Sequence, residues 1–187
     1  MTEDIKKACE VLNNGGLILY PTDTIWGIGC DATNEKAVQK VFDLKKRADS
    51  KALIVMIDNT VKLDFYVDEV PELAIDLIEV SEKPMTVIYD KGRNIAPNLL
   101  AEDGSLAIRV TQERFSNELC KRFRKAIVST SANVSGTTAP RYFDEIDDEI
   151  IAGVDYVVQY RQDDITPTKA SSIIKLKNDG EIKIIRE

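Results

Sequence analysis

Hydrophobic residues in the first third of the chain alternate between a helical spacing and short apolar runs. An amphipathic helix is predicted over residues 3–14, and a short strand, Leu17 to Tyr20, follows it. A second helix is predicted from about Asn34 to Lys46, because its apolar positions recur at i, i+3 and i+4 and Asn34 is a suitable N-cap. A buried strand, Leu53 to Ile57, comes next. This alternation is typical of a sheet covered by helices.

The rest of the chain continues the alternation and ends in strands alone. Two helices are predicted, over Pro71 to Val80 and Arg114 to Phe123. Strands are predicted at Met85 to Tyr89, Leu106 to Val110, Ala126 to Ser129, near Val154 to Val158, Ser171 to Leu176 and Glu181 to Ile185. Residues 178–180, Asn-Asp-Gly, predict a hairpin turn between the last two strands. The expected fold is α/β: one domain over residues 1–187, with an open, twisted, mixed parallel and antiparallel sheet and flanking helices.

The composition is that of a soluble globular protein, with 43% hydrophobic and 30% charged residues among 187. The longest apolar run, Ala52 to Ile57, is too short to cross a bilayer. Residues 1–16 lack the long apolar core and the cleavage site of a secretory signal. We therefore expect a cytoplasmic protein without a membrane partner.

The sequence contains no histidine, which removes several kinds of catalytic site. A Ser-His-Asp triad, a Cys-His pair, a HExxH zinc site and a histidine general base are all excluded. Cys9, Cys30 and Cys120 are widely spaced, with no CxxC, so we expect three reduced, packed thiols. No GxGxxG or GxxxxGK[ST] motif follows a predicted strand, so the common dinucleotide and P-loop fingerprints are absent.

The charge balance is acidic, with 25 Lys and Arg against 32 Asp and Glu and a net charge of −7. This balance opposes tight non-specific binding of nucleic acid or of an anionic membrane. An anionic ligand therefore needs a local cationic pocket, for which the clearest candidates are Lys45, Lys46, Arg47 and Lys51. These cations either offset the dipole at the end of the preceding helix or clamp a polyphosphate.

Two polar segments follow predicted strands, the position at which open α/β sheets bind ligands. The first, PTDTIWGIGCDATN over residues 21–34, either presents two threonine hydroxyls and a carboxylate to a ligand or forms a turn with Trp26 in the core. The second, IVSTSANVSG over residues 127–136, either presents hydroxyl and backbone N–H groups to an anion or is a polar turn. Arg109, inside the strand pattern LAIRV, needs an anion, which is either a carboxylate of the protein or a substrate.

The order of the motifs resembles that of the YrdC family, the threonylcarbamoyl-AMP synthases. PTDTIWGIGCDATN is followed by KKR, KPMT, LAIRV, STSANVSG, SSII and a final IIR, so the resemblance spans residues 15–186. It implies a YrdC-like fold with a concave ligand cavity. It also implies that L-threonine, bicarbonate and ATP with Mg²⁺ give threonylcarbamoyl-adenylate and pyrophosphate, without a tightly bound prosthetic group. The product would pass to a transferase that modifies adenosine in tRNA.

The same resemblance implies roles for individual residues. The threonine site would contain Thr24, Arg109, Ser129 and Ser171. ATP would be held by Lys45, Arg47, Lys51, Ser105, Ser131, Asn133 and Arg186. Catalysis would rest on Lys45, Arg47, Ser131 and Asn133, and no residue is assigned as a metal ligand. A chain without histidine can carry such a reaction, because adenylyl transfer needs alignment and charge neutralisation more than proton shuttling.

The chain departs from the family pattern in its loops. The usual prolines are replaced by Ala48, Ala52 and Ala170, and the usual Pro-Gly-Pro is replaced by Glu82-Lys83-Pro84. These changes alter loop stiffness and remove none of the proposed ligands. The acceptor of the threonine amine's proton is open between Asp23, a second substrate amine, bicarbonate and water.

Two other functions remain open at the level of sequence. One is a double-stranded RNA or tRNA-binding module of the same fold without synthase activity. The other is a carbamoyl-transfer domain of the hydrogenase-maturation kind, which the lack of Cys/His clusters opposes.

The charge balance predicts weak binding of RNA. Only residues 45–51 and 121–125 gather enough cations, and the acidic run Asp144 to Glu149 adds repulsion. We expect a Kd for tRNA or an RNA duplex that is micromolar or weaker at about 0.15 M salt, with competition by ATP. Fluorescence anisotropy measures this affinity, and nanomolar binding that ATP leaves unchanged would favour the RNA-binding module.

Overall fold

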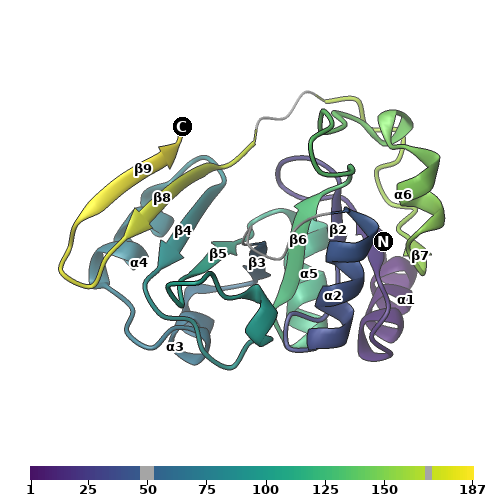
Figure 1. Ribbon diagram of the computed structural model, residues 1–187. Helices are drawn as coiled ribbons and strands as arrows, with labels where there is room; N and C mark the ends of the chain where they lie inside the picture. Colours follow the sequence, from purple (N-terminus) through teal and green to yellow (C-terminus); the bar gives the residue numbers. More distant parts are fainter. Residues whose placement is uncertain (47–52, 167–169) are drawn as a thin grey trace.

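The computed structural model describes residues 1–46, 53–166 and 170–187, and nine strands in these residues form one mixed sheet (Figure 1). The strands are β1 (Ile18–Tyr20), β2 (Gly27–Gly29), β3 (Ile54–Ile57), β4 (Met85–Tyr89), β5 (Leu106–Val110), β6 (Ile127–Ser131), β7 (Tyr156–Val157), β8 (Ser172–Leu176) and β9 (Ile182–Arg186). Their order in the sheet is β7-β1-β2-β6-β3-β5-β4-β8-β9. The pairs β1–β7, β3–β5 and β4–β8 are parallel, and the other neighbours are antiparallel. The predicted fold class is confirmed.

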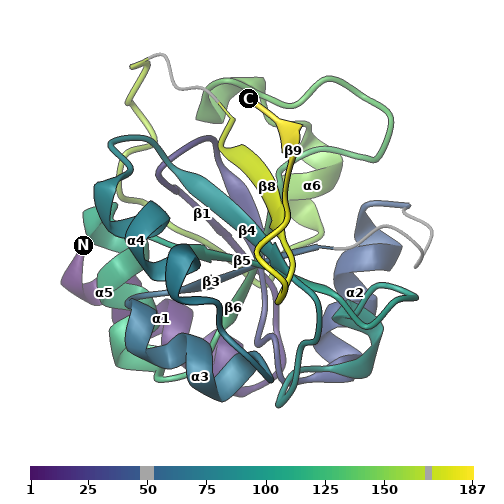
Figure 2. The same ribbon diagram turned by 90° about the vertical axis from the view of Figure 1, so that its left-hand side faces the viewer.

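Helices cover both faces of the sheet, with α1, α3, α4 and α5 on one side and α2 and α6 on the other (Figure 2). The α-helices are α1 (Thr2–Asn13), α2 (Glu35–Leu44), α3 (Leu63–Tyr66), α4 (Glu72–Val80), α5 (Arg114–Phe123) and α6 (Asp148–Ala152). Short 3₁₀ turns occur at Thr60–Lys62, Pro97–Leu99 and Phe143–Glu145. In the described ranges, none of the helices is long and apolar enough to cross a membrane.

Local sequence signals account for several of these elements. The Asn34 side chain accepts hydrogen bonds from the backbone N–H groups of Lys36 and Ala37, at 3.1 and 3.2 Å, which confirms the predicted cap of α2. At the predicted hairpin turn, Gly180 has φ of +88°, a conformation that glycine adopts without a steric penalty. The observed bounds of α5, β4 and β5 match the predicted ones.

The three cysteines are buried free thiols, as predicted. Burial raises the pKa of Cys30 and Cys120, which keeps both as neutral thiols packed in the core. Their place in the hydrophobic core explains them without a redox or metal-binding role.

Strand β2 was not predicted, because its sequence Gly-Ile-Gly looks like part of a turn. The glycines let β2 fit closely between β1 and β6. A Cβ atom on Gly29 would lie 2.7 Å from the Tyr20 ring and 3.0 Å from the Val128 carbonyl oxygen. A Cβ atom on Gly27 would meet nothing nearer than the Thr130 carbonyl oxygen, at 3.3 Å. The absence of a side chain at residue 29 is therefore a packing requirement.

The difference between the two glycines is testable. We expect Gly29→Ala to lower the free energy of unfolding by about 1 to 3 kcal/mol, because the added methyl group overpacks the β1–β2–β6 contact. Gly27→Ala is the matched control and should cost less, since a shift of a few tenths of an ångström relieves its contact. Urea denaturation measures both variants, and equal losses would contradict this account of β2.

Candidate functional site

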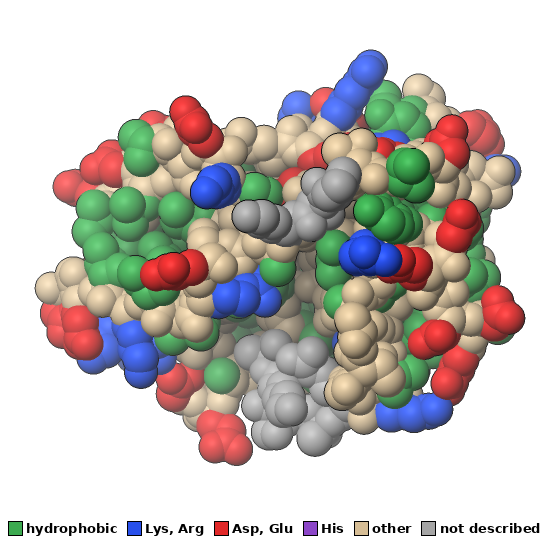
Figure 3. Space-filling model, turned by 90° about the horizontal axis from the view of Figure 1, so that it is seen from above, with side chains coloured by type: hydrophobic (Ala, Val, Ile, Leu, Met, Phe, Trp, Pro, Cys, Tyr) green, Lys and Arg blue, Asp and Glu red, His purple; other side chains and the backbone are tan. Residues whose placement is uncertain are grey.

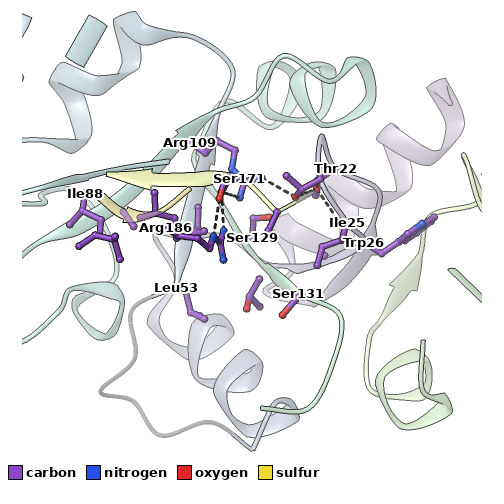
Figure 4. A pocket seen from close by; sticks show the side chains of 18 residues that line it. Thr22, Ile25, Trp26, Leu53, Ile88, Arg109, Ser129, Ser131, Ser171 and Arg186 are labelled. Carbon is purple, nitrogen blue, oxygen red and sulfur yellow. Dashed lines mark hydrogen bonds between the residues drawn. The ribbon is translucent and has the colours of Figure 1, made fainter. Parts of the chain in front are cut away.

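A cavity of about 310 Å³ opens near the centre of the sheet and is lined by residues from several strands and from the turn after β1. The face in Figure 3 is hollowed between the β1–β2 half and the β8–β9 half of the molecule. Polar or glycine lining comes from the turn after β1, from β2, β5 and β6, and from the ends of β8 and β9: Thr22, Thr24, Gly27, Arg109, Ser129, Thr130, Ser131, Ser171 and Arg186. All four residues predicted for the threonine site, Thr24, Arg109, Ser129 and Ser171, therefore line one cavity, and the last three are labelled in Figure 4.

Arg109 is the most heavily bonded side chain of this cavity, although only 4% of it is exposed. Its Nη1 donates to Asp23 Oδ1 at 2.8 Å and to Thr24 Oγ1 at 3.2 Å. Its Nε donates to Thr86 Oγ1 at 3.2 Å, and its Nη2 donates to Ser171 Oγ at 3.3 Å. We call these five residues the Arg109 network. The carboxylate expected for Arg109 is present in the protein as Asp23. Arg109 also lines a cavity, so a substrate can be a second anion.

A guanidinium group has five N–H donors, and acceptors among the described residues take four of those of Arg109. The remaining N–H is on Nη2, the nitrogen that also binds Ser171. Because the rest of the group is held in place, this donor has a fixed direction. It can bind one oxygen of an anionic ligand without a rearrangement of the network.

The turn after β1 is held by its own hydroxyl groups. Thr22 Oγ1 donates to the Ile25 carbonyl oxygen at 2.7 Å and accepts from the backbone N–H of Thr24 at 3.1 Å. Trp26 packs its ring against Phe143, with ring centroids 4.9 Å apart, and is 5% exposed. It also lines the cavity, so the turn both completes the core and builds the site.

Ser171 brings a second arginine to the same place. Arg186 donates from Nε to the Ser171 carbonyl oxygen at 2.9 Å and from Nη2 to Ser171 Oγ at 3.2 Å. Desolvation and the charge of Arg109 both lower the pKa of Arg186. Two guanidinium groups that share one hydroxyl repel each other, and an anion bound beside them would relieve this repulsion.

An irregularity in β9 explains why two consecutive residues reach the cavity. Ile173 pairs with Arg186, but Ile174 pairs with Ile184, so Ile185 is an extra residue on β9. Such a bulge turns a neighbouring side chain to a new direction. Both Ile185 and Arg186 consequently line the cavity.

One wall of the cavity is apolar. It is formed by Leu53, Ile54, Ile88, Ala107, Ile173 and Ile185, of which Leu53 and Ile88 are labelled in Figure 4. An aliphatic wall in the same cavity as two arginines suits a ligand that has both an anionic group and an apolar part. Sequence reasoning did not single out these residues, because they are ordinary strand residues whose meeting depends on the sheet order.

The loop after β6 is fixed from its inner side by Lys45. This lysine caps the C-terminus of α2, is 1% exposed, and donates from Nζ to the carbonyl oxygens of Ser131 at 2.5 Å and Asn133 at 2.6 Å. Asn133 Nδ2 donates to the Thr137 carbonyl oxygen at 2.8 Å, whereas Asn133 Oδ1 is buried without a hydrogen-bond partner in residues 1–46, 53–166 and 170–187. Ser131 lines the cavity, whereas Lys45 and Asn133 are not among the described residues that line it.

Three other residues predicted to bind ATP are not among the described residues that line the cavity. Arg47 and Lys51 lie outside the described residues, as do Ala48 and Ala52. Ser105 precedes β5, at the opposite end of that strand from Arg109, and its N–H donates to Asp103 Oδ1 at 3.0 Å. It is not among the cavity's lining residues, so its contact with ATP stays a prediction.

Similar chains carry names that agree with the predicted activity. A protein of Methanocaldococcus jannaschii described as a putative threonylcarbamoyl-AMP synthase is 35% identical over 188 residues, which cover 97% of this chain and 86% of that protein. A threonylcarbamoyl-AMP synthase of Pseudomonas aeruginosa is 35% identical over 154 residues, which cover 78% of this chain and 83% of that enzyme.

The fold is similar to that of a solved protein with a larger chain. The crystal structure of Sua5 from P. abyssi, in a complex with L-threonine, superimposes with a TM-score of 0.79 at 24% identity. The match covers 92% of this chain and 50% of the Sua5 chain, so this chain spans about half of that protein. At this identity the likeness shows the fold.

Substitutions of the two arginines of the cavity should affect stability to different extents. Arg109→Gln leaves the Asp23 carboxylate, whose side chain is 11% exposed, without its cation, and should lower the free energy of unfolding by about 3 to 5 kcal/mol. Arg186→Gln, on an exposed strand, is the control and should change it by less than about 1 kcal/mol. Chemical denaturation measures both, and equal effects would contradict the structural role of the Arg109 network.

The family match extends over nearly all of the chain. Residues 10–187 match the family Sua5_yciO_yrdC, described as "Telomere recombination". This range includes both polar segments, Arg109 and every residue of the cavity. The chain therefore belongs to the Sua5/YciO/YrdC family.

Proposed function

We propose that this protein is a threonylcarbamoyl-AMP synthase, which makes threonylcarbamoyl-adenylate and pyrophosphate from L-threonine, bicarbonate and ATP. The observation that carries the proposal is the Arg109 network: a buried guanidinium with one fixed N–H left at a cavity that also holds Thr24, Ser129 and Ser171. The names of relatives that are 35% identical over most of their length support the same activity.

Threonine would bind at the cationic end of the cavity. Its carboxylate would accept the free Nη2–H of Arg109, and its methyl group would face the apolar wall. Thr24 and Ser129 offer hydroxyl oxygens at the same end for the amine or the hydroxyl of the amino acid. A small polar ligand with one methyl group fits a site of this chemistry.

ATP would occupy the rest of the cavity and its rim. Ser131 and Arg186 line the cavity, and Asn133 Oδ1, which has no hydrogen-bond partner among the described residues, is an acceptor in the adjoining loop. Arg47 and Lys51 follow α2 in the sequence, and we assign to them the phosphate contacts that the family resemblance implies. Lys45 would position the loop after β6, because it donates to two carbonyl groups of that loop. This role would come in addition to its predicted contact with ATP.

The chemistry needs alignment and positive charge more than an acid or a base. The threonine nitrogen bonds to the bicarbonate carbon with loss of water and of a proton, which gives a carbamate. A carbamate oxygen then bonds to the α-phosphorus of ATP, and the bond from that phosphorus to pyrophosphate breaks. Positioned cations and dipoles stabilise the charge that moves to the leaving group.

We assign bicarbonate or water as the acceptor of the proton that the threonine amine loses. Asp23, the protein candidate, accepts a hydrogen bond from Arg109 Nη1 at its Oδ1 and lines a smaller cavity together with Lys83. This cavity is separate from the one lined by Thr24 and Ser129. We therefore assign Asp23 to holding Arg109.

Magnesium would enter as part of the ATP substrate. Within residues 1–46, 53–166 and 170–187 no group of three or more cysteine or acidic side chains is arranged to hold a metal ion. Phosphate oxygens and water molecules would supply ligands of Mg²⁺, because this ion usually keeps several waters and binds substrate phosphates. Bound in this way, the ion adds positive charge at the phosphates.

The product carries an activated carbamoyl group that water hydrolyses. A transferase must therefore bind the product and transfer this group. We propose a tRNA threonylcarbamoyl transferase in the cytoplasm as this partner, in line with the family resemblance. The RNA-binding module is not favoured, because the two arginines that the structure places in the cavity already contact Ser171.

The substrate assignment predicts a strict requirement. Purified protein should release pyrophosphate from ATP only when L-threonine and bicarbonate are both present. With L-serine the rate should fall roughly 10- to 200-fold, because one methyl contact is missing. A coupled pyrophosphate assay measures this, and equal rates with serine and threonine would contradict the substrate assignment.

A further inference from the structure

Thr86 lies behind the cavity and has no part in the reaction as proposed. It is in β4, it has no exposed surface, and it is not one of the described residues that line the cavity. The pairing of β4 with β5 places it directly opposite Arg109. The motif KPMT drew attention to Thr86 in the sequence but left it without a role.

The hydroxyl group of Thr86 contacts two residues that line the cavity, Arg109 and Ser171. Its Oγ1 accepts from Arg109 Nε at 3.2 Å and lies 3.0 Å from Ser171 Oγ. Within the Arg109 network, Thr86 Oγ1 thus binds both the Arg109 guanidinium and the Ser171 hydroxyl group. Thr86 itself is not among the described residues that line the cavity.

The donors and acceptors around Ser171 decide which hydroxyl group donates. Ser171 Oγ accepts from Arg109 Nη2 and from Arg186 Nη2, which fills both of its lone pairs. Its own proton must therefore go to Thr86 Oγ1. With a second bond from Arg109 Nε, both lone pairs of the Thr86 oxygen are filled as well.

We propose that Thr86 is a positioning residue, which sets the direction of the Arg109 guanidinium and of the Ser171 hydroxyl group at the threonine end of the cavity. The proposal rests on the proposed function. While Thr86 holds Arg109 Nε, the free N–H on Nη2 keeps its direction toward the ligand. While Thr86 accepts the Ser171 proton, Ser171 stays an acceptor for both arginines.

Loss of the Thr86 oxygen has a defined consequence. Arg109 Nε and the Ser171 proton both lose their acceptor in a buried place, and they can recover one only if the guanidinium or the serine turns. Either movement shifts the donor that meets the amino acid carboxylate. Threonine binding should weaken, and the binding of ATP, whose predicted contacts extend along the loop after β6, should change little.

The test compares Thr86→Ala with Thr86→Ser, because the two variants differ only in the hydroxyl oxygen. Thr86→Ala should raise the KM for threonine by about 10- to 100-fold over Thr86→Ser, with the KM for ATP and kcat within about threefold. Thr86→Ser should stay within about threefold of the wild type, which is rescue by the conservative variant. Thr111→Ala is the matched control, since Thr111 is equally buried and its hydroxyl group pairs with Ser116, outside the cavity.

Three results would overturn the proposal: an equal KM for threonine in Thr86→Ala and Thr86→Ser, an increase that Thr111→Ala reproduces, or a loss confined to kcat. Circular dichroism checks that each variant is folded, and Thr86→Val, which keeps the volume, replaces Thr86→Ala if that variant is unfolded. A wild-type protein without threonine-dependent pyrophosphate release would contradict the proposed function itself. An active wild type with an unaffected Thr86→Ala would contradict only the role of Thr86.

Discussion

The burial of the Arg109 guanidinium is the constraint on which the site depends. A buried cation without partners is costly, and here its partners come from the turn after β1, from β4 and from the start of β8. These segments are far apart in the sequence, so the network forms only when the sheet has its observed order. The fold and the ligand end of the cavity are consequently stabilised by the same bonds.

Close packing and one irregularity shape the space around this cation. Glycines in β2 allow β1 and β6 to approach, which brings the Thr24 turn and Ser129 to one cavity. The bulge at Ile185 turns β9 so that Arg186 reaches Ser171. Lys45, at the end of α2, holds two carbonyl groups of the loop after β6. The glycines and the bulge act through backbone geometry, and Lys45 acts through its side chain.

Much of the fold follows from local sequence signals, and the site follows from them only in part. Helix α5 and strands β4 and β5 have clear periodicity, and Asn34 has the chemistry of a cap, so these were predicted within a residue or two. An arginine in an apolar strand predicted a partner anion, and Asp23 is that partner. Strand β2 was missed because glycine lacks strand propensity, and because the need for a glycine at residue 29 arises from contacts with Tyr20 on β1 and Val128 on β6.

The features of the site that sequence reasoning missed depend on the pairing of strands that are distant in the sequence. Thr86 meets Arg109 through the register of β4 on β5, which a single sequence does not specify. The bulge in β9 likewise depends on pairing with β8. The residues of the threonine site, Thr24, Arg109, Ser129 and Ser171, were assigned through family resemblance, and the structure brings them to one cavity. Arg47 and Lys51 lie outside the described residues, and their roles stay predictions.

The central claim is that the Nη2–H of Arg109, which has no acceptor among the described residues, binds the carboxylate of an amino acid. Calorimetric titration of the wild-type protein with L-threonine and with L-threoninol tests it most directly, because threoninol keeps the amine, hydroxyl and methyl groups and replaces the carboxylate by CH₂OH. The account predicts that threoninol binds weaker than threonine by about 10- to 100-fold, the range for a hydrogen bond to a charged group. Equal affinities for the two ligands would contradict it.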